Sequence, residues 1–157
     1  MLKEKKNIII LVIVVIFIII MAIWGLSNKA DAQFWNENTK VKCLPNSHDN
    51  LVIHIHPTLE IYMDGEKQLI PANLGIKAGC MAEIHTHDAT GVLHVESFDR
   101  NRDFVLSEFF EVWEEPFERE GYSLEITVNG QKNEEYGDFV FRDRDSIVLE
   151  YSSLEDL

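Results

Sequence analysis

Five histidines within a span of 41 residues are the side chains best suited to chemistry in this chain. Two lie in Val-Ile-His-Ile-His-Pro and three in Glu-Ile-His-Thr-His-Asp-Ala-Thr-Gly-Val-Leu-His-Val-Glu-Ser; they are His54, His56, His85, His87 and His94. Side chains alternate along a β-strand, so two histidines separated by one residue point to the same face. The sixth histidine, His48, lies in a polar segment, and we interpret it as a bystander.

The three downstream histidines fit one β-hairpin. A four-residue loop at residues 88–91 would join an arm at residues 81–87 to an arm at residues 92–98. In that register His85 lies opposite His94, and directly opposed side chains have Cβ atoms about 4.5–5.5 Å apart. His87 lies one step further along the same face. The spacing therefore predicts that three imidazoles converge from one local piece of chain, with little loop-closure entropy to overcome.

Imidazole nitrogens suit copper or zinc better than calcium or magnesium. The pattern predicts a site for one of these metals, with a coordination position open for water or substrate if three histidines bind. His54 and His56 would complete the set or replace members of it. Asp88 and Glu96 are predicted to accept the outer N–H of a ligand histidine. The alternative is a hydrogen-bonded polar cluster or a pH-responsive face, because histidine titrates near neutrality.

Alternating β-formers predict the strands that must position these rings. Residues 51–63 indicate one strand, or two strands interrupted at Pro57, and Asp64-Gly65 and Asn129-Gly130 are hairpin turn signals. Ser107 is the predicted N-cap of one short helix near residues 108–114. The fold class is therefore α+β, mostly β, built from antiparallel hairpins. The order of strands and turns at the C-terminal end suggests a β-grasp-like part.

The two cysteines, Cys43 and Cys80, each precede a histidine pair. On the exported side of a membrane they would form a disulfide, which in the chain-entropy model contributes about 3–4 kcal/mol. The alternative is thiolate ligation, which would favour Cu(I) or structural zinc.

An apolar run at residues 8–26 predicts where in the cell the protein lies. It carries no charge, has about the length that a helix needs to cross a bilayer, and follows Lys-Glu-Lys-Lys. We expect the chain to divide into a cytoplasmic basic tail at residues 1–7, a transmembrane signal-anchor at residues 8–26, a linker at residues 27–50, and an extracytoplasmic histidine-rich β domain at residues 51–157. The alternative is a signal peptide cleaved after Ala32, within the small-x-small sequence Ala30-Asp31-Ala32.

The net charge of the chain restricts the kinds of partner that it can bind. A formal net charge of −13 argues against nucleic acid, because phosphate binding needs a basic face. The expected partners are the membrane, a metal ion and a membrane-protein partner. The sequence has no serine-nucleophile elbow, phosphate-binding loop, dinucleotide fingerprint or His-Glu-x-x-His. The absence of these motifs leaves open whether the protein is an enzyme.

Four segments in order carry a resemblance to a known group of proteins. They are HIHPTLEIYMDG, IPANLGI, IHTHDATGVLHVES and FVLSEFFEVW. Residues 43–113 resemble an uncharacterised family of small, membrane-anchored, exported, histidine-rich proteins of archaea and bacteria. The resemblance implies a shared signature formed by His54, His56, His85, His87, Asp88, Gly91, His94 and Glu96, and it supplies no established activity.

Three functions follow as hypotheses. The first is a membrane-anchored extracytoplasmic domain that binds copper or zinc through the histidines, for metal handling or for a simple metal-dependent reaction. The second is a non-catalytic interaction or accessory domain of a membrane complex, in which the histidines form a structural network. The third is a metal-dependent hydrolase or oxidase.

Overall fold

The computed structural model describes residues 13–21, 33–44 and 50–154. The chain divides into two units, Met1–Ala32 and Gln33–Leu157. In the first unit, residues 13–21 are helical. Within the described ranges no helix is both long enough and apolar enough to cross a membrane. The predicted anchor at residues 8–26 extends beyond these ranges, and the predicted cleavage site at Ala32 lies outside them.

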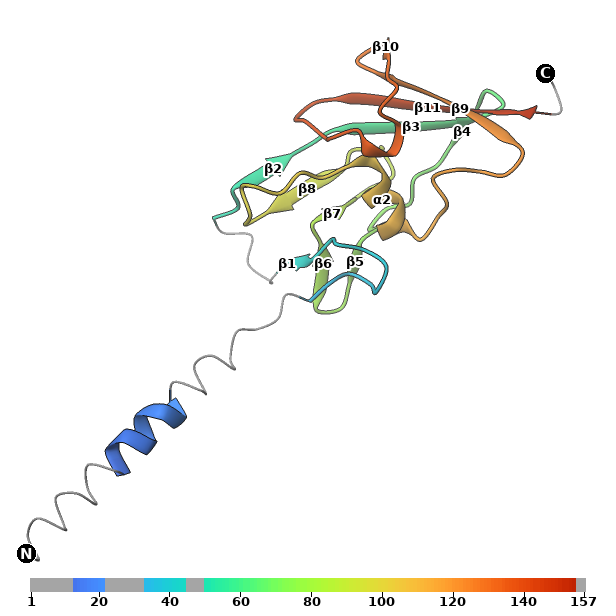
Figure 1. Cartoon of the computed structure of the whole chain (residues 1–157). Coiled ribbons are helices and arrows are strands. Elements are labelled where there is room, and N and C mark those ends of the chain that lie inside the picture. The colour runs from blue at the N-terminus through green and yellow to red at the C-terminus, as the bar shows by residue number, and fades with distance from the viewer. Residues whose placement is uncertain (1–12, 22–32, 45–49, 155–157) are drawn as a thin grey trace, which may run out of the picture. The chain divides into compact units, whose positions relative to one another are not determined.

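A five-stranded sheet with the order β10-β9-β11-β3-β4 forms the main layer of the second unit (Figure 1). Its strands are β3 (Thr58–Met63), β4 (Glu66–Gln68), β9 (Tyr122–Val128), β10 (Gln131–Lys132) and β11 (Ser146–Ser153). The central strands β3 and β11 are parallel, and the other neighbours are antiparallel. With a helix between its two hairpins, this sheet has the strand order of a β-grasp fold. The predicted mostly β, α+β class is confirmed, and the β-grasp arrangement includes the first hairpin as well as the C-terminal part.

The two hairpin turns form where the sequence predicts them. Asp64 and Gly65 both have positive φ, as do Asn129 and Gly130. Such turns match the right-handed twist of the flanking strands, and Asp, Asn and Gly tolerate the left-handed conformation. The turns therefore fix the registers Met63↔Glu66 and Val128↔Gln131.

The helix α2 (Leu106–Trp113) packs Phe109 and Phe110 into the core. It begins after Val105, whose backbone N–H donates to the Glu108 carboxylate at 3.2 Å. The prediction of Ser107 as N-cap is therefore wrong by two residues, because Glu108 reaches back to the start of the helix. The helix ends at Glu114, which has a positive φ of 63°.

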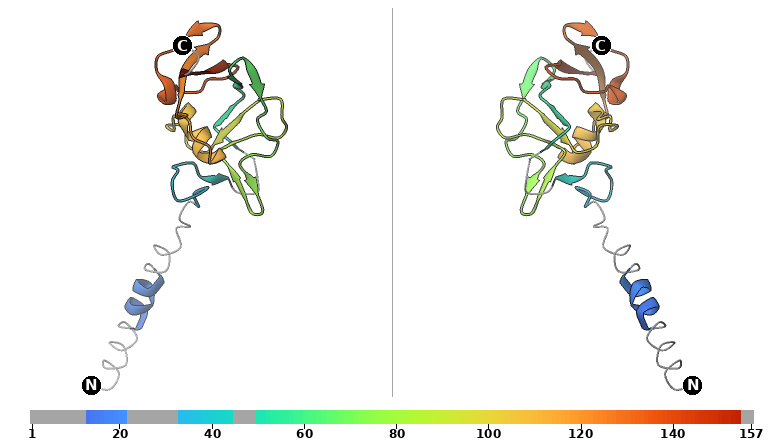
Figure 2. Two further views of the ribbon diagram at one scale, coloured as in Figure 1. Left: turned by 90° about the vertical axis from the view of Figure 1, so that its right-hand side faces the viewer. Right: turned by 90° about the vertical axis from the view of Figure 1, so that its left-hand side faces the viewer.

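Two three-stranded sheets are built mainly by the chain between β4 and α2. The first has the order β1-β6-β5, with β1 (Cys43–Leu44), β6 (Cys80–Ala82) and β5 (Ile76–Lys77), and Figure 2 shows it at the end of the domain away from β10. The second has the order β2-β8-β7, with β2 (Ile53–Ile55), β8 (His94–Ser97) and β7 (Ile84–His85). Ile84 and Val95 are fully buried in the same core as Leu59 of β3, so the histidine-bearing strands are anchored to the main sheet.

Residues 33–44, which were predicted to belong to the linker, are part of the domain. Val41 is 0% exposed, and the Trp35 indole Nε1 donates to the Val112 carbonyl at 3.0 Å. Cys43 forms the predicted disulfide with Cys80, with their Cα atoms 5.0 Å apart. Thiolate ligation by these cysteines is therefore excluded in the oxidised protein.

Replacing both cysteines by serine should lower the free energy of unfolding by about 4 kcal/mol, because the disulfide closes a loop with a sequence separation of 37. Chemical denaturation of the wild type and of Cys43→Ser/Cys80→Ser would measure the difference, with reduced wild-type protein as control. Equal midpoints and slopes for the oxidised wild type and the double variant would contradict the prediction.

Candidate metal centre

The small sheet β2-β8-β7 brings the five predicted histidines together. His54 lies on β2, His94 on β8 and His85 on β7, while His56 follows β2 and His87 follows β7 by two residues. We call this set, His54, His56, His85, His87 and His94, the histidine cluster. Alternation along β8 sends Val95 into the core, which leaves His94 on the opposite face. The strand pairing therefore places side chains from three strands on one face.

The predicted pairing of His85 with His94 is confirmed, but the hairpin around it is shorter than expected. β7 ends at His85 and β8 begins at His94. A loop at residues 88–91 would place Val92 opposite His87, but Val92 forms a bridge with Thr58 instead. The intervening loop runs beside β3, and the Gly91 carbonyl accepts the Leu59 N–H at 2.8 Å. A Cβ at Gly91 would lie 2.4 Å from the Leu59 carbonyl oxygen, so this approach requires glycine.

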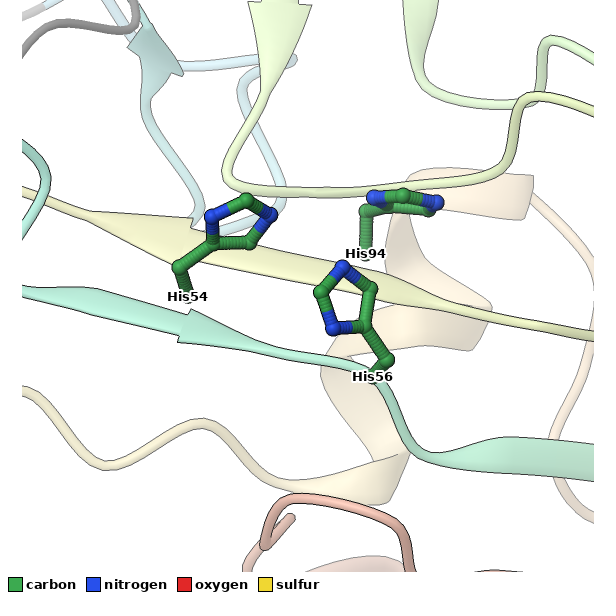
Figure 3. A group of neighbouring side chains, drawn as sticks. All are labelled: His54, His56 and His94. Atoms are coloured by element: carbon green, nitrogen blue, oxygen red, sulfur yellow. The ribbon is translucent and has the colours of Figure 1, made fainter.

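His94 occupies the centre of the cluster. Its ring centroid lies 4.5 Å from that of His87 and 4.7 Å from that of His56. The centroid of His85 lies 5.3 Å away and that of His54 6.3 Å away. Figure 3 shows His54 on β2, His56 just after β2 and His94 on β8, with one nitrogen of His56 directed toward the His94 ring.

The His85 ring is held in one tautomer. Its side chain is fully buried, and Nδ1 lies 2.9 Å from the Ala82 carbonyl oxygen. Because a carbonyl can only accept, Nδ1 carries the proton and Nε2 presents its lone pair. That Nε2 lies 3.3 Å from Nε2 of His87. Bonds of about 2.0–2.1 Å to a tetrahedral zinc put two ligand nitrogens at about this separation.

Carboxylates surround the cluster, although not all as predicted. Glu96, only 2% exposed, places Oε1 3.2 Å from His54 Nε2. Asp88 accepts hydrogen bonds from the Thr90 hydroxyl and N–H, and these bonds lower the pKa of Asp88 more than the nearby rings do. Asp88 therefore shapes the loop while its charge still reaches His87 and His94.

Asp143 is a site residue that the sequence analysis missed. Its Oδ1 accepts the His56 backbone N–H at 3.0 Å and lies 3.9 Å from the ring nitrogen Nδ1. His56 and Asp143 are 87 positions apart in sequence. They precede β3 and β11, and the parallel pairing of these strands places the two preceding segments side by side. A local sequence pattern carries no signal for such a contact.

The imidazole of His94 is disposed to remain neutral. Burial, followed by the neighbouring rings of His87, His56 and His54, lowers the pKa of His94 from 6.5 to about 4, while Asp88 opposes this shift. Neutral imidazole is the form that binds metals. At neutral pH His94 is therefore ready to act as a ligand without losing a proton.

Among the described residues, two groups of ligand atoms could hold an ion. One is His54, His56 and His94, and the other is His85, His87 and His94; within each group the ligand atoms lie within 4.8 Å of one another. Either group supplies three nitrogens, which leaves a coordination position for water or another molecule.

Comparison with known proteins adds nothing to this geometry: no family model, curated protein or solved structure matches the chain. The chemistry of the site therefore follows from its own residues. The resemblance to membrane-anchored, histidine-rich proteins stays a prediction.

The lowered pKa of His94 predicts a specific acid sensitivity of the metal-free protein. The unfolded chain takes up this proton below about pH 6.5 and the folded one only near pH 4, so stability is lost as the pH falls through this window. Thermal unfolding in the presence of a chelator would measure it. The melting temperature of His94→Gln should fall less between pH 7 and pH 4.5 than that of the wild type. Parallel curves for the two proteins would contradict the assignment.

Proposed function

We propose that this protein binds a transition metal, copper or zinc, through its histidine cluster. The observation that carries the proposal is the pair formed by His85 and His87. One ring has its tautomer set by a buried carbonyl, and its lone pair faces the second ring at 3.3 Å. His94, held neutral, completes the group of three.

The ligand types support copper or zinc over other metals. All five candidate ligands are imidazoles, and both cysteines are in the disulfide. Imidazole suits zinc and copper, whereas calcium and magnesium prefer oxygen ligands. The formal charge of −13 favours accumulation of cations near the protein.

We further propose that the domain works outside the cytoplasm, anchored by its N-terminal apolar segment. The disulfide supports this setting, because disulfides persist in oxidising compartments. The uncharged run at residues 8–26, preceded by lysines, supports a membrane anchor with the N-terminus in the cytoplasm.

A second candidate function is a non-catalytic interaction or accessory domain with a structural histidine network. The contacts of His54 with Glu96 and of His85 with Ala82 favour it, since they satisfy ring nitrogens without an ion. Metal analysis separates the two candidates.

Protein purified without a histidine tag should contain at least about one copper or zinc ion per chain by elemental analysis. Added metal at one hundred times its dissociation constant should stabilise the fold by about 2.7 kcal/mol. His94→Gln should lose most of the metal, because His94 belongs to both groups.

His48→Ala is the matched control, since it removes the one histidine that is not a candidate ligand, and this variant should keep its metal. Circular dichroism would verify that each variant is folded. A wild type that holds no metal, and whose melting temperature is unchanged by added Cu²⁺ or Zn²⁺, would overturn the proposal and favour the structural network.

Glu96→Gln should raise the metal dissociation constant about 10–100-fold, because it removes the buried negative charge beside His54. Competition with a coloured chelator would measure the constant. Glu125→Gln is the control, because it makes the same carboxylate-to-carboxamide change at an exposed position on β9. Equal constants for all three proteins would show that Glu96 has no part in binding.

A further inference from the structure

His94 belongs to both groups of candidate ligands, and it lies between them. The perpendicular ring of His56 is on one side, with centroids 4.7 Å apart, and the near-perpendicular ring of His87 is 4.5 Å away. In Figure 3 one His94 nitrogen lies on the side of His54 and His56, and the other points away from them. An imidazole has two nitrogens and can therefore serve two ions at once.

We propose that the histidine cluster binds two transition-metal ions bridged by the His94 imidazolate. His54 and His56 hold one ion, and His85 and His87 hold the other. This inference rests on the proposed metal binding and specifies its stoichiometry and electronic coupling. The two ions would be about 6 Å apart, the sum of two metal–nitrogen bonds and the width of the ring.

When the second ion binds, it replaces the remaining N–H proton of His94. The first ion bonds to one nitrogen of neutral His94, whose other nitrogen still carries a proton. The second ion bonds to that nitrogen as the N–H proton passes to solvent. No electron is transferred, and both ions keep their oxidation state.

A single ion cannot use the whole cluster. Ligand nitrogens on one zinc or copper ion lie about 3–4 Å from one another, given bonds of about 2 Å. The five histidines divide into two groups of three that meet only at His94, and the centroids of His54 and His94 are already 6.3 Å apart. One ion would therefore leave two histidines on the far side of His94 without a role in ligation.

Negative charge is available on both sides to offset the repulsion between two cations. Glu96 lies beside His54, and Asp143 lies beside His56. On the other side, the charge of Asp88 interacts with His87 and His94. The imidazolate itself adds a further negative charge between the ions.

Titration of the metal-free full chain with Cu²⁺, in detergent and without a histidine tag, tests the bridge by electron paramagnetic resonance. The first equivalent should give the signal of an isolated copper ion. The second should bind as well, and the integrated signal should then fall well below the total copper, because imidazolate couples the two spins. Protein loaded with one equivalent of Zn²⁺ and then one of Cu²⁺ should keep the full copper signal.

Two matched variants, His54→Ala and His87→Ala, each remove an exposed ring from one group only. Each should bind one copper tightly and show no coupling. His94→Gln should abolish the coupling while remaining folded by circular dichroism, and His48→Ala should behave as the wild type.

The outcomes separate this inference from the proposed function. Saturation at one copper per chain, or two coppers with an undiminished signal, would overturn the bridge and leave metal binding intact. A protein that binds no copper would overturn both.

Discussion

The pairing of β8 with two neighbours is the constraint on which the site depends. His54 of β2 is opposite Glu96, and His85 of β7 is opposite His94. A shift of either register by one residue would move every side chain of that strand to the other face. The burial of Val95 and Ile84 in the core makes such a shift costly, so the hydrophobic effect holds the imidazoles in place.

Packing five imidazoles together has an electrostatic consequence. Burial, followed by the neighbouring imidazoles of His87, His56 and His54, lowers the pKa of His94 to about 4, so this ring stays neutral at neutral pH. Contacts with Ala82, Glu96 and Asp143 orient individual rings, but none of them places positive charge at the centre. A cation bound there would use ring nitrogens such as the facing Nε2 atoms of His85 and His87.

Stability and chemistry are assigned to different parts of the domain. The five-stranded sheet and α2 supply the largest fully buried side chains, such as Tyr151, Phe109 and Phe110, while the segment between β4 and α2 supplies His85, His87 and His94. The approach of Gly91 to Leu59 of β3 joins the two parts, and Ile84 and Val95 pack into the same core as Leu59. The site is thus placed beside a rigid sheet, which favours a preformed arrangement of ligands.

Local sequence determined what local interactions control. It predicted the Asp-Gly and Asn-Gly turns, the disulfide and the opposition of His85 and His94, because each depends on short-range geometry or on there being only two cysteines to pair. It left open whether residues 51–63 form one strand or two, and the structure has two. Only the tertiary structure decided that β2 pairs with β8, that Asp143 reaches His56, and that the chain from Gln33 packs into the domain. These contacts join residues far apart in sequence, and their free energy comes from the burial of a shared core. The division of the histidines into two groups around His94 is therefore a property of the fold rather than of their spacing.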